Sequence, residues 1–405
     1  MENLRNSKRP VIGIFNDSFP PIMDGVGLTV QNTAHWLNKM NQPVCVVTPQ
    51  SSGNFIEQPY PVYRYMSLPL ISRYPYRLGM PVLDISFRDT LAQVPFGLVH
   101  AHCPFSSGRL ALKIAKTRKI PLVATFHSKY RDDFERLFFH KIMMERIIKK
   151  IIAFYHAADE VWIPQASVED TIRMYGFKGK LFVVENGNDF SNTTLKDISK
   201  LEARKELNIS PEELILLFVG QHIWQKNLKM IIDALCLIKD LKFLFLFVGT
   251  GYAAKDLKQM AETLGLSGRV RFEGQIVDRE LLKKYYAAAD LFIFPSIYDN
   301  APLTVREAGA LQTPSILVRG STASEIITDN QNGFLVENSA ESLANKIREI
   351  SSHTEQMEMI GKNAAKTIAR SWEDVTAEVH DRYNQLIIRK SIHRNIYRPH
   401  LLNSF

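Results

Sequence analysis

The sequence contains little cysteine and no long apolar run. Its three cysteines, Cys45, Cys103 and Cys236, lie far apart in 405 residues and match no metal-ligand spacing. This pattern argues against a disulfide framework and is typical of a reducing compartment, so we expect a cytoplasmic protein. The longest apolar runs have the length of a strand, which is too short for a membrane-spanning helix. The first residues also lack the apolar core of a signal peptide.

Acidic residues are outnumbered by basic ones, and the formal net charge is +8. The excess indicates an anionic partner, such as nucleotide phosphates, an anionic membrane surface or nucleic acid. No zinc-finger, RNA-recognition or helix-turn-helix signature accompanies the charge, so we expect no nucleic-acid binding. The length predicts two or three domains, and an apolar share of 45% is ordinary for a globular protein.

Apolar runs of strand length alternate with helical patterns along most of the chain. Residues 55–95 are the exception, because they are rich in arginine and aromatic residues, and we expect them to be irregular. The alternation predicts an α/β fold with two doubly wound, parallel sheets. We assign residues 1–190 to a first Rossmann-like domain, 191–199 to a polar linker, 200–370 to a second such domain, and 371–405 to a C-terminal helix with a basic tail.

The stretch with the most promising chemistry runs from Leu291 to Ala310. An apolar run at 291–294 predicts a buried parallel strand, and a helix follows with Glu307 in its first turns. Asp299 lies in the loop between them, eight positions before Glu307. The N–H groups at the helix start suit a phosphate, and the flanking carboxylates suit sugar or ribose hydroxyls. An ordinary helix cap with a surface acid is the alternative.

Three other features follow predicted strands, where the ligands of α/β sheets bind. Gly25 and Gly27 form a predicted turn before a helix at 28–40, and glycine lets a ligand approach the backbone closely. His127 lies just past another strand. Lys226 lies at a strand-to-helix turn, where an ammonium suits a diphosphate. Each feature also has a simpler interpretation, namely a tight turn, a structural histidine and a solvated lysine.

Residues 133–156 form a predicted amphipathic helix with many basic side chains. Ile148 and Ile152 are among its apolar positions, and Lys149 and Lys150 are among its basic ones. Such helices can lie on anionic membranes, which makes peripheral contact with the inner face of the plasma membrane a hypothesis. We favour the alternative, in which the helix packs on its own sheet.

Taken in order, these motifs resemble the retaining glycosyltransferases of family 4 (group 1), which have the GT-B fold. The likeness covers nearly the whole chain. It rests on Phe19-Pro-Pro with Gly25-Val-Gly27, His127, Asn186-Gly-Asn-Asp189, Val219-Gly220 with Gln225-Lys226-Asn227, Phe247-Val-Gly-Thr-Gly251, Phe272-Glu-Gly274, and Asp299 with Glu307. Residues 102–108 and the basic helix are similar to bacterial members that glucosylate diacylglycerol or other lipids. The resemblance implies two Rossmann-like domains facing across a cleft, with the last helix crossing back to the first domain.

The resemblance also implies roles for individual residues. Glu307 would bind the ribose hydroxyls, Asp299 and His127 would contact the transferred sugar, and Lys226 would neutralise the diphosphate. Asp299, His127 and Lys226 are therefore the implied catalytic residues. The other implied donor contacts are Gly25, Gly27, Gln221, Gly249, Gln275, Ile276, Asn300, Ala301, Pro302, Leu303 and Thr304. Backbone groups near Gln275 and Ile276 would meet the base, and no metal or cofactor is implied, because protein cations would stabilise the leaving diphosphate.

The implied activity is transfer of a hexose, with retention, from a nucleoside-diphosphate sugar to a lipid or glycan acceptor. UDP is the favoured nucleotide. Three residues depart from the family pattern: Asp299 stands where glutamate is usual, Gln221 where arginine is usual, and Gln312 where glycine is common. Because position 221 carries no cation, Lys226 would have to neutralise more of the phosphate charge. These departures leave open a second interpretation, a catalytically weak protein that binds nucleotide sugars or regulates through a degenerate site.

Overall fold

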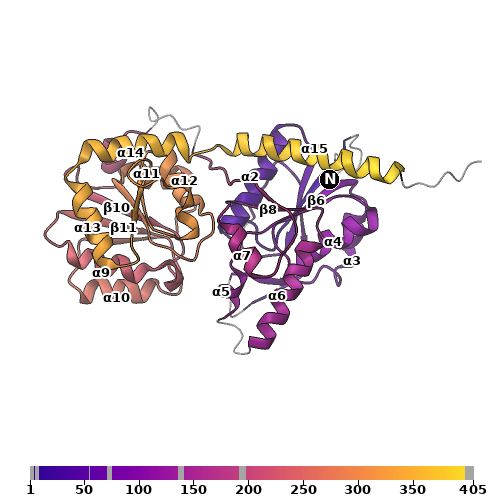
Figure 1. Cartoon of the computed structure of the whole chain (residues 1–405), viewed down its shortest axis with the longest axis horizontal. Helices are drawn as coiled ribbons and strands as arrows, with labels where there is room; N and C mark the ends of the chain where they lie inside the picture. Colours follow the sequence, from indigo (N-terminus) through magenta and orange to yellow (C-terminus); the bar gives the residue numbers. More distant parts are fainter. Residues whose placement is uncertain are drawn as a thin grey trace, which may run out of the picture. The chain divides into compact units, whose positions relative to one another are not determined.

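The structure is a computed structural model that describes Leu4 and residues 9–53, 55–70, 75–135, 141–190 and 198–396. Contacts between Cα atoms divide the chain into two compact units. The first unit comprises Met1–Asn186 with Trp372–Phe405, and the second comprises Gly187–Ser371. Each unit is built on its own parallel sheet (Figure 1).

The sheet of the first unit has the strand order β3-β2-β1-β6-β7-β8-β9, and every neighbouring pair is parallel. Its strands are β1 (Val11–Phe15), β2 (Val44–Pro49), β3 (Val62–Tyr65), β6 (Phe96–Ala101), β7 (Leu122–Thr125), β8 (Glu160–Ile163) and β9 (Leu181–Val183). Every residue of β1, β2 and β7 is buried, as expected for parallel strands covered by helices on both faces.

Seven helices with described bounds accompany this sheet (Figure 1). They are α2 (Gly25–Lys39), α3 (Ile85–Ala92), α4 (Ser106–Arg118), α5 (Tyr130–Glu135), α6 (Lys141–His156), α7 (Val168–Met174) and α15 (Trp372–Ile396). The long α15 packs against α2 and β6. It brings the end of the described chain back to the first sheet.

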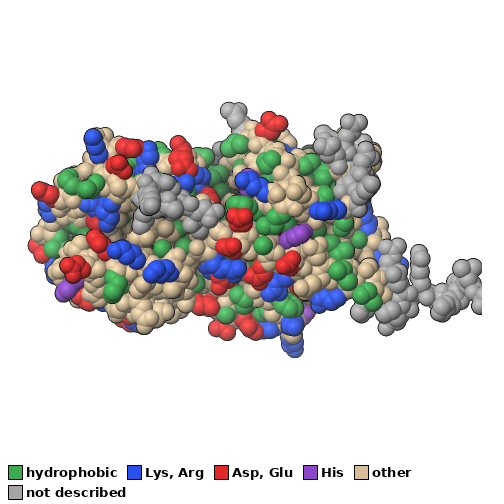
Figure 2. Space-filling model, turned by 90° about the horizontal axis from the view of Figure 1, so that it is seen from above, with side chains coloured by type: hydrophobic (Ala, Val, Ile, Leu, Met, Phe, Trp, Pro, Cys, Tyr) green, Lys and Arg blue, Asp and Glu red, His purple; other side chains and the backbone are tan. Residues whose placement is uncertain are grey.

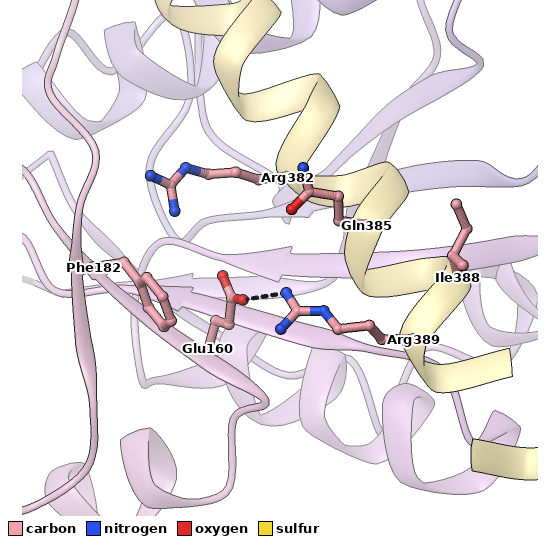
Figure 3. A pocket seen from close by; sticks show the side chains of 6 residues that line it. All are labelled: Glu160, Phe182, Arg382, Gln385, Ile388 and Arg389. Atoms are coloured by element: carbon pink, nitrogen blue, oxygen red, sulfur yellow. Dashed lines mark hydrogen bonds and ion pairs between the residues drawn. The ribbon is translucent and has the colours of Figure 1, made fainter. Parts of the chain in front are cut away.

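Polar contacts help to attach α15 to the strands. The Tyr383 hydroxyl lies 2.5 Å from His100 Nδ1, and Arg389 pairs with buried Glu160 at 2.8 Å (Figure 3). Phe182 and Arg382 help to line a cavity of about 470 Å³ beside this ion pair. Glu160 is the first residue of β8. The cavity therefore lies near the amino end of that strand, whereas ligands of such sheets bind at the carboxyl ends.

The sheet of the second unit has the order β12-β11-β10-β13-β14-β15 and is also parallel throughout. Its strands are β10 (Leu214–Val219), β11 (Phe243–Val248), β12 (Val270–Gly274), β13 (Leu291–Phe294), β14 (Ser315–Val318) and β15 (Phe334–Val336). Its helices are α8 (Lys200–Glu206), α9 (Leu228–Leu237), α10 (Ala254–Thr263), α11 (Arg279–Ala288), α12 (Leu303–Ala310), α13 (Ala340–Ser351) and α14 (Thr354–Thr367), with the short 3₁₀ turns η2 (Trp224–Lys226) and η3 (Thr322–Ile326). In Figure 1, α11 and α12 lie on one side of the sheet and α9 and α10 on the other.

The predicted fold, two doubly wound domains with parallel sheets, is confirmed. The main error concerns residues 55–95, which we expected to be irregular. They contain β3, the antiparallel hairpin of β4 (Ser67–Pro69) and β5 (Arg77–Gly79), and α3. β3 is an edge strand in which only Tyr63 and Tyr65 are buried, so its short alternating pattern was hidden among arginines. Arg73 and Tyr74 lie outside the described residues.

The predicted glycine turn at Gly25 and Gly27 is also wrong. Both residues belong to the first turn of α2, which begins three positions earlier than expected. Asp24 caps this helix, because its Oδ1 accepts a hydrogen bond of 2.6 Å from the Gly27 N–H. A Cβ added at Gly25 would meet no atom within 4 Å, so the surface above this turn is open. The aspartate cap is the signal that should have set the helix start.

The division between the units differs slightly from the expected boundaries. Residues 187–190 belong to the second unit, where Phe190 is fully buried in the core and the Asn188 N–H donates to Arg370 O at 2.9 Å. Ser371 also belongs to the second unit, and the first unit resumes at Trp372. Most of the expected linker (191–197), residues 136–140 of the expected basic helix, and the tail after 396 lie outside the described residues.

The basic excess is not gathered on the face drawn in Figure 2. Acidic and basic side chains are intermixed there on both units. Among the described residues, charged side chains also pair directly, as Lys229 does with Asp233 and Arg348 does with Asp240. The net charge alone therefore marks no binding surface on this face.

Candidate active site

Lys226 and Asp299 form an ion pair at the carboxyl end of the second sheet. Lys226 closes the turn η2 after β10, and Asp299 lies in the loop after β13. The Lys226 Nζ atom donates to Asp299 Oδ1 and Oδ2 at 2.8 and 2.9 Å, and Ser296 Oγ donates to Oδ2 at 2.6 Å. Because β10 and β13 are parallel neighbours, their carboxyl-terminal loops meet at one edge of the sheet.

The ion pair holds its positive charge in a sheltered position. Lys226 is only 9% exposed, and its Nζ atom lies 5.2 Å from the centre of the Phe294 ring. An ammonium group has three N–H donors, and Asp299 takes two of them, so one donor remains for a further acceptor. An anion that arrives here would interact more strongly with this charge than it would at an exposed surface.

The first turn of α12 follows Asp299 closely and is uncapped by side chains. Its N-cap is Pro302, which supplies no side-chain hydrogen bond to the turn. The first N–H groups of a helix have no partner inside the helix, and they carry positive potential. The Thr304 hydroxyl oxygen is buried and has no hydrogen-bond partner among the residues that the structure describes. With Leu303 and Asn300 also buried and Ala301 half-buried, this turn presents its donors within a sheltered edge.

Glu307 is buried at the centre of a second charged network. Its Oε1 accepts from Arg279 Nη2 at 2.6 Å, and its Oε2 accepts from the Tyr286 hydroxyl at 2.7 Å. Arg279 also makes two bonds to Asp189, at 2.8 and 2.6 Å. The Phe190 ring lies 4.4 Å from the Arg279 guanidinium. One arginine therefore bridges two carboxylates from distant parts of the sequence.

The protonation of this network follows from its burial and charge. Burial raises the pKa of Tyr286 well above its ordinary value, and the Glu307 carboxylate raises it further, so the hydroxyl stays a donor. Burial alone would lower the pKa of Arg279, but the charges of Glu307 and Asp189 outweigh it and raise that pKa. The sequence analysis missed Arg279 and Tyr286. A basic residue at the unfavourable N-terminal end of a helix was the available signal for Arg279.

The other donor residues named from the sequence occupy the loops of β10, β11 and β12. Gly249 has a φ of +133°, and a Cβ there would lie 1.9 Å from the Gly220 carbonyl oxygen, so this close approach requires glycine. It lines a pocket of about 270 Å³. Gln221 and Gln275 are exposed and Ile276 is half-buried, and none of these three lines that pocket.

His127 lies at the carboxyl end of the first sheet, in a group of three histidines. His127 Nε2 is 3.0 Å from His102 Nδ1, and the two rings are stacked. The His102 ring packs in turn on His100, with ring centres 4.1 Å apart. Burial lowers the pKa of His127 to about 4 and holds the pKa values of His100 and His102 well below the ordinary value, so all three are neutral near pH 7.

The same edge of the first sheet contains a carboxylate that the sequence analysis missed. Asp17 accepts hydrogen bonds from the Tyr65 hydroxyl, Ser106 Oγ, the Ser107 N–H and Cys103 Sγ, at 3.0, 2.6, 2.9 and 3.2 Å. These donors occupy the carboxylate and fix the start of α4 against β1. Asp17 therefore acts as a structural cap rather than as a free charge.

Comparison with known proteins identifies the family. A model described as "Glycosyl transferases group 1" matches residues 199–367, and one described as "Glycosyltransferase Family 4" matches residues 23–192. The chain belongs to the family 4 glycosyltransferases. The matches to the two models fall on the second and the first unit respectively, apart from a few residues at the boundary.

Relatives of this glycosyltransferase include two enzymes named alpha-monoglucosyldiacylglycerol synthase. The Streptococcus pneumoniae enzyme is 27% identical over 334 residues, covering 80% of this chain and 74% of the relative. The Acholeplasma laidlawii enzyme is 24% identical over 404 residues, covering 94% of this chain and 100% of the relative. These relatives support a glycosyltransferase that acts on lipid or glycan acceptors.

Solved structures with the same fold include sucrose-phosphate synthase from Thermosynechococcus elongatus and HepE from Anabaena in complex with UDP and glucose. The first aligns with a TM-score of 0.79 at 22% identity and covers 94% of this chain and 100% of the other. The second aligns with a TM-score of 0.75 at 19% identity and covers 93% of this chain and 99% of the other. At these identities the likeness establishes the GT-B fold of the glycosyltransferase.

The described part of the glycosyltransferase has neither a metal-binding cluster nor a helix that could span a membrane. No group of three or more histidine, cysteine, aspartate or glutamate side chains there could hold a metal ion. No helix in that part is long and apolar enough to cross a membrane. Lys226 and Arg279 are two side-chain cations near the carboxyl edge of the second sheet.

Proposed function

We propose that this glycosyltransferase moves a hexose, with retention of configuration, from a UDP-sugar to a diacylglycerol-type lipid at the cytoplasmic membrane face. The observation that carries the proposal is the sheltered Lys226–Asp299 ion pair next to the uncapped start of α12. This arrangement places an ammonium, helix N–H donors and a carboxylate together at the carboxyl edge of the second sheet. A sugar diphosphate needs donors of this kind for its phosphates and an acceptor for its hydroxyls.

The donor side of the proposal rests on the second unit. Glu307 would accept from the ribose hydroxyls while Arg279 and Tyr286 hold its carboxylate in a fixed orientation. A carboxylate offers about four lone-pair sites, and two donors already occupy two of them, so capacity remains for a ribose diol. HepE, which shares the fold, is in complex with UDP and glucose, and this favours UDP as the nucleotide.

The proposed chemistry uses the charges of the chain. As the sugar–phosphate bond breaks, negative charge grows on the diphosphate, and Lys226 with the α12 N–H groups would stabilise it. Asp299 would hold a hydroxyl of the transferred sugar while keeping Lys226 in place. In a front-face transfer the leaving phosphate takes the acceptor proton, so no protein base is required. The reaction as proposed uses no metal or cofactor.

The acceptor side rests on the relatives, two of which are named alpha-monoglucosyldiacylglycerol synthase. The apolar stripe of α6, including Ile148 and Ile152, is buried in the first unit, which favours packing on its own sheet. Ile142 remains 72% exposed and Met143 42% exposed at the start of α6. We propose that this end of the helix, with nearby lysines, makes peripheral contact with an anionic membrane.

A donor and acceptor screen tests the function. Purified protein is incubated with UDP-glucose, UDP-galactose or GDP-mannose and diacylglycerol liposomes, and mass spectrometry detects released nucleotide and glycolipid. Glycolipid formed from a UDP-sugar supports the proposal. Release of UDP only when soluble glycans are added would overturn the lipid acceptor and keep the donor.

Liposome flotation tests the membrane contact separately. Ile142→Glu should reduce flotation with anionic vesicles, whereas Ile388→Glu, a change at another exposed isoleucine, serves as the matched control. Equal flotation of Ile142→Glu and the unchanged protein would remove α6 from the proposal.

A catalytically weak binding protein is the second candidate. The observation that favours it is the exposed, uncharged Gln221, which stands where the family usually has arginine. The two candidates predict different rates of sugar transfer, but both predict that the protein binds the nucleotide. Calorimetric binding of UDP without any product from the screen would support this candidate.

A further inference from the structure

The cavity of about 470 Å³ between α15 and the last two strands of the first sheet contains none of the residues proposed for sugar transfer (Figure 3). Pockets for small ligands usually measure about 300–1,000 Å³. The cavity lies at the amino end of β8, whereas His127 lies past the carboxyl end of the parallel strand β7. The lining residues are Glu160 of β8, Phe182 of β9, and Arg382, Gln385, Ile388 and Arg389 of α15.

Helical spacing brings the polar residues of α15 to the cavity. Arg382, Gln385 and Arg389 recur at intervals of three and four positions, so they share one face of the helix. Tyr383 and Leu386 are buried on the adjacent face, which packs on the first unit. Figure 3 shows the Arg382 and Arg389 side chains reaching from α15 towards Phe182 and Glu160. One wall of the cavity is therefore helix, and the other is sheet.

The carboxylate in the sheet wall is already paired. The Glu160 side chain is only 5% exposed. Its Oε1 accepts from Arg389 Nη2 at 2.8 Å, and its Oε2 accepts from Trp162 Nε1 at 2.9 Å. A buried carboxylate is costly unless it is paired and hydrogen-bonded, and these two contacts meet that need without a ligand. The cavity therefore needs no cation to balance this charge.

Hydrogen-bond donors on the helix wall remain for a ligand. Arg382 Nε and Nη2 share a single oxygen, Glu378 Oε1, at 3.2 Å, and Nη1 has no hydrogen bond among the described residues. The side chains of this pair are 30% and 37% exposed, and such pairs are weak. The Gln385 amide also lacks a partner in the described part of the chain. A guanidinium beside an amide suits a carboxylate or a phosphate, which accepts parallel N–H bonds.

An apolar surface lies beside these donors. The centre of the Phe182 ring is 5.8 Å from the Arg382 guanidinium and 4.7 Å from Lys180 Nζ, which adds positive charge. Ile388 lines the cavity and is 56% exposed, and Val183, next to Phe182, is 42% exposed. A ligand that covered the ring and Ile388 would remove apolar area from water. The cavity thus combines cationic donors with an apolar surface.

We propose that this cavity binds a small organic anion. Arg382 and Gln385 would bind its carboxylate or phosphate, and Phe182 and Ile388 would cover its apolar body. Such a ligand would contact both α15 and the sheet, so it would stabilise the helix on β8 and β9. It is neither donor nor acceptor in the proposed transfer, because substrates of such sheets bind at the carboxyl ends. The inference does not depend on the identity of the sugar, the base or the acceptor.

Calorimetry with phenyl phosphate, octanoate and inorganic phosphate tests the proposal, with and without saturating UDP. Phenyl phosphate joins an anion to a ring, octanoate joins one to a chain, and inorganic phosphate has no apolar body. We expect at least one organic anion to bind about tenfold or more tightly than inorganic phosphate, because its apolar body is buried. Binding should persist with UDP present and should raise the melting temperature of the protein.

Two variants locate the binding. Arg382→Glu reverses the charge at the cavity, and Ile388→Trp fills part of its space. Each should weaken binding of the organic anion about tenfold or more. Both side chains are partly exposed, so the melting temperature without ligand should change little. Arg348→Glu, the same charge reversal at an exposed position of α13, is the matched control and should bind as the unchanged protein does.

The remaining results would overturn the inference. If neither organic anion binds, or if Arg382→Glu and Arg348→Glu bind it equally well, the cavity is not the site. Loss of binding when UDP is added would assign the anion to the nucleotide site instead. Inorganic phosphate that binds as tightly as the organic anions would leave Phe182 and Ile388 without a role. Failure of the protein to bind UDP would count against the proposed function alone.

Discussion

The two units present the same kind of sheet edge with opposite chemistry. In the first unit, the neutral rings of His100, His102 and His127 pack against one another at the carboxyl edge, and four donors saturate the Asp17 carboxylate. In the second unit, full charges lie at the corresponding edge, with Lys226 held by Asp299. The parallel topology is shared, so the difference arises from a few side chains at the strand ends.

The contrast fits the two partners of a glycosyl transfer. The donor carries a diphosphate whose charge grows during the reaction, and fixed cations stabilise such a charge. The acceptor hydroxyl carries no net charge and needs no such cation, and His100 and His102 at the first edge are only 2% and 3% exposed, so they act mainly as packing groups. Changes to the second edge should therefore reduce catalysis strongly, whereas changes to the first edge should act mainly through stability.

The largest expected effect is that of removing the buried cation. We expect Lys226→Ala to lower turnover about 100- to 1,000-fold, the usual range for loss of one electrostatic stabiliser of a transition state. UDP and pyrophosphate should also bind more weakly. The measurement is UDP release from UDP-glucose together with calorimetry. Lys229→Ala is the control, because that lysine lies close in sequence and its side chain is 65% exposed.

A small effect of Lys226→Ala would contradict the assignment of the diphosphate to this edge. Removal of Lys226 also leaves Asp299 without its cation, so the double variant Lys226→Ala/Asp299→Asn separates the two causes. If activity returns in the double variant, the unpaired carboxylate and not the lost ammonium was responsible.

The sequence predicted which loops form the carboxyl edge of the second sheet better than it predicted the side-chain contacts within that edge. Alternating strands and helices indicate a parallel sheet, and in such a sheet the loops of β10 and β13 must lie together. The Lys226–Asp299 pair and the bridge from Arg279 to Asp189 and Glu307 join residues 73, 90 and 28 positions apart. Local pattern carries no information about which long side chains meet across such distances. The same limit hid β3, whose place at a sheet edge shows in the sequence only as alternating tyrosines.

The second effect concerns the ribose side of the same edge. We expect Glu307→Ala to weaken UDP binding about 10- to 100-fold, because hydrogen bonds to a charged group contribute about 1.5–3 kcal/mol. Stability should fall as well, since Arg279 loses one of its two carboxylates. Glu307→Gln keeps the volume and should lose less. Calorimetry and thermal melting measure both effects, and Glu212→Ala, at a side chain 80% exposed, is the control.

A loss of stability without a loss of UDP affinity would assign Glu307 a structural role. Binding of uridine alone sharpens the distinction, because it contains the ribose and lacks the diphosphate. Glu307→Ala should weaken uridine and UDP alike, whereas Lys226→Ala should weaken only UDP.

The neutral histidines of the first edge predict a pH dependence of stability. Unfolded histidine binds a proton below about pH 6.5, whereas His127 in the folded protein does so only below about pH 4. Between these values the unfolded state binds more protons, so the free energy of unfolding rises with pH and is lost as pH falls. We expect His127→Gln to reduce the loss between pH 7 and pH 5 by about 1–2 kcal/mol. Urea titrations at several pH values measure the free energy of unfolding. If its dependence on pH is the same in His127→Gln as in the unchanged protein, His127 is protonated in the folded state.

The smallest effect should come from the contact between α15 and the first edge. Tyr383→Phe removes the hydroxyl that lies 2.5 Å from His100 Nδ1 and leaves that buried nitrogen without this partner. We expect a loss of about 1 kcal/mol in the free energy of unfolding, the usual net value of a buried hydrogen bond. Ile392→Ala, at an exposed position of the same helix, should cost less. UDP affinity should stay the same in both variants, because His100 belongs to strand β6 of the first unit, whereas Lys226 and Glu307 belong to the second unit. A fall in UDP affinity for Tyr383→Phe alone would mean that the neutral edge also acts on the donor, and the division of labour between the two edges would have to be abandoned.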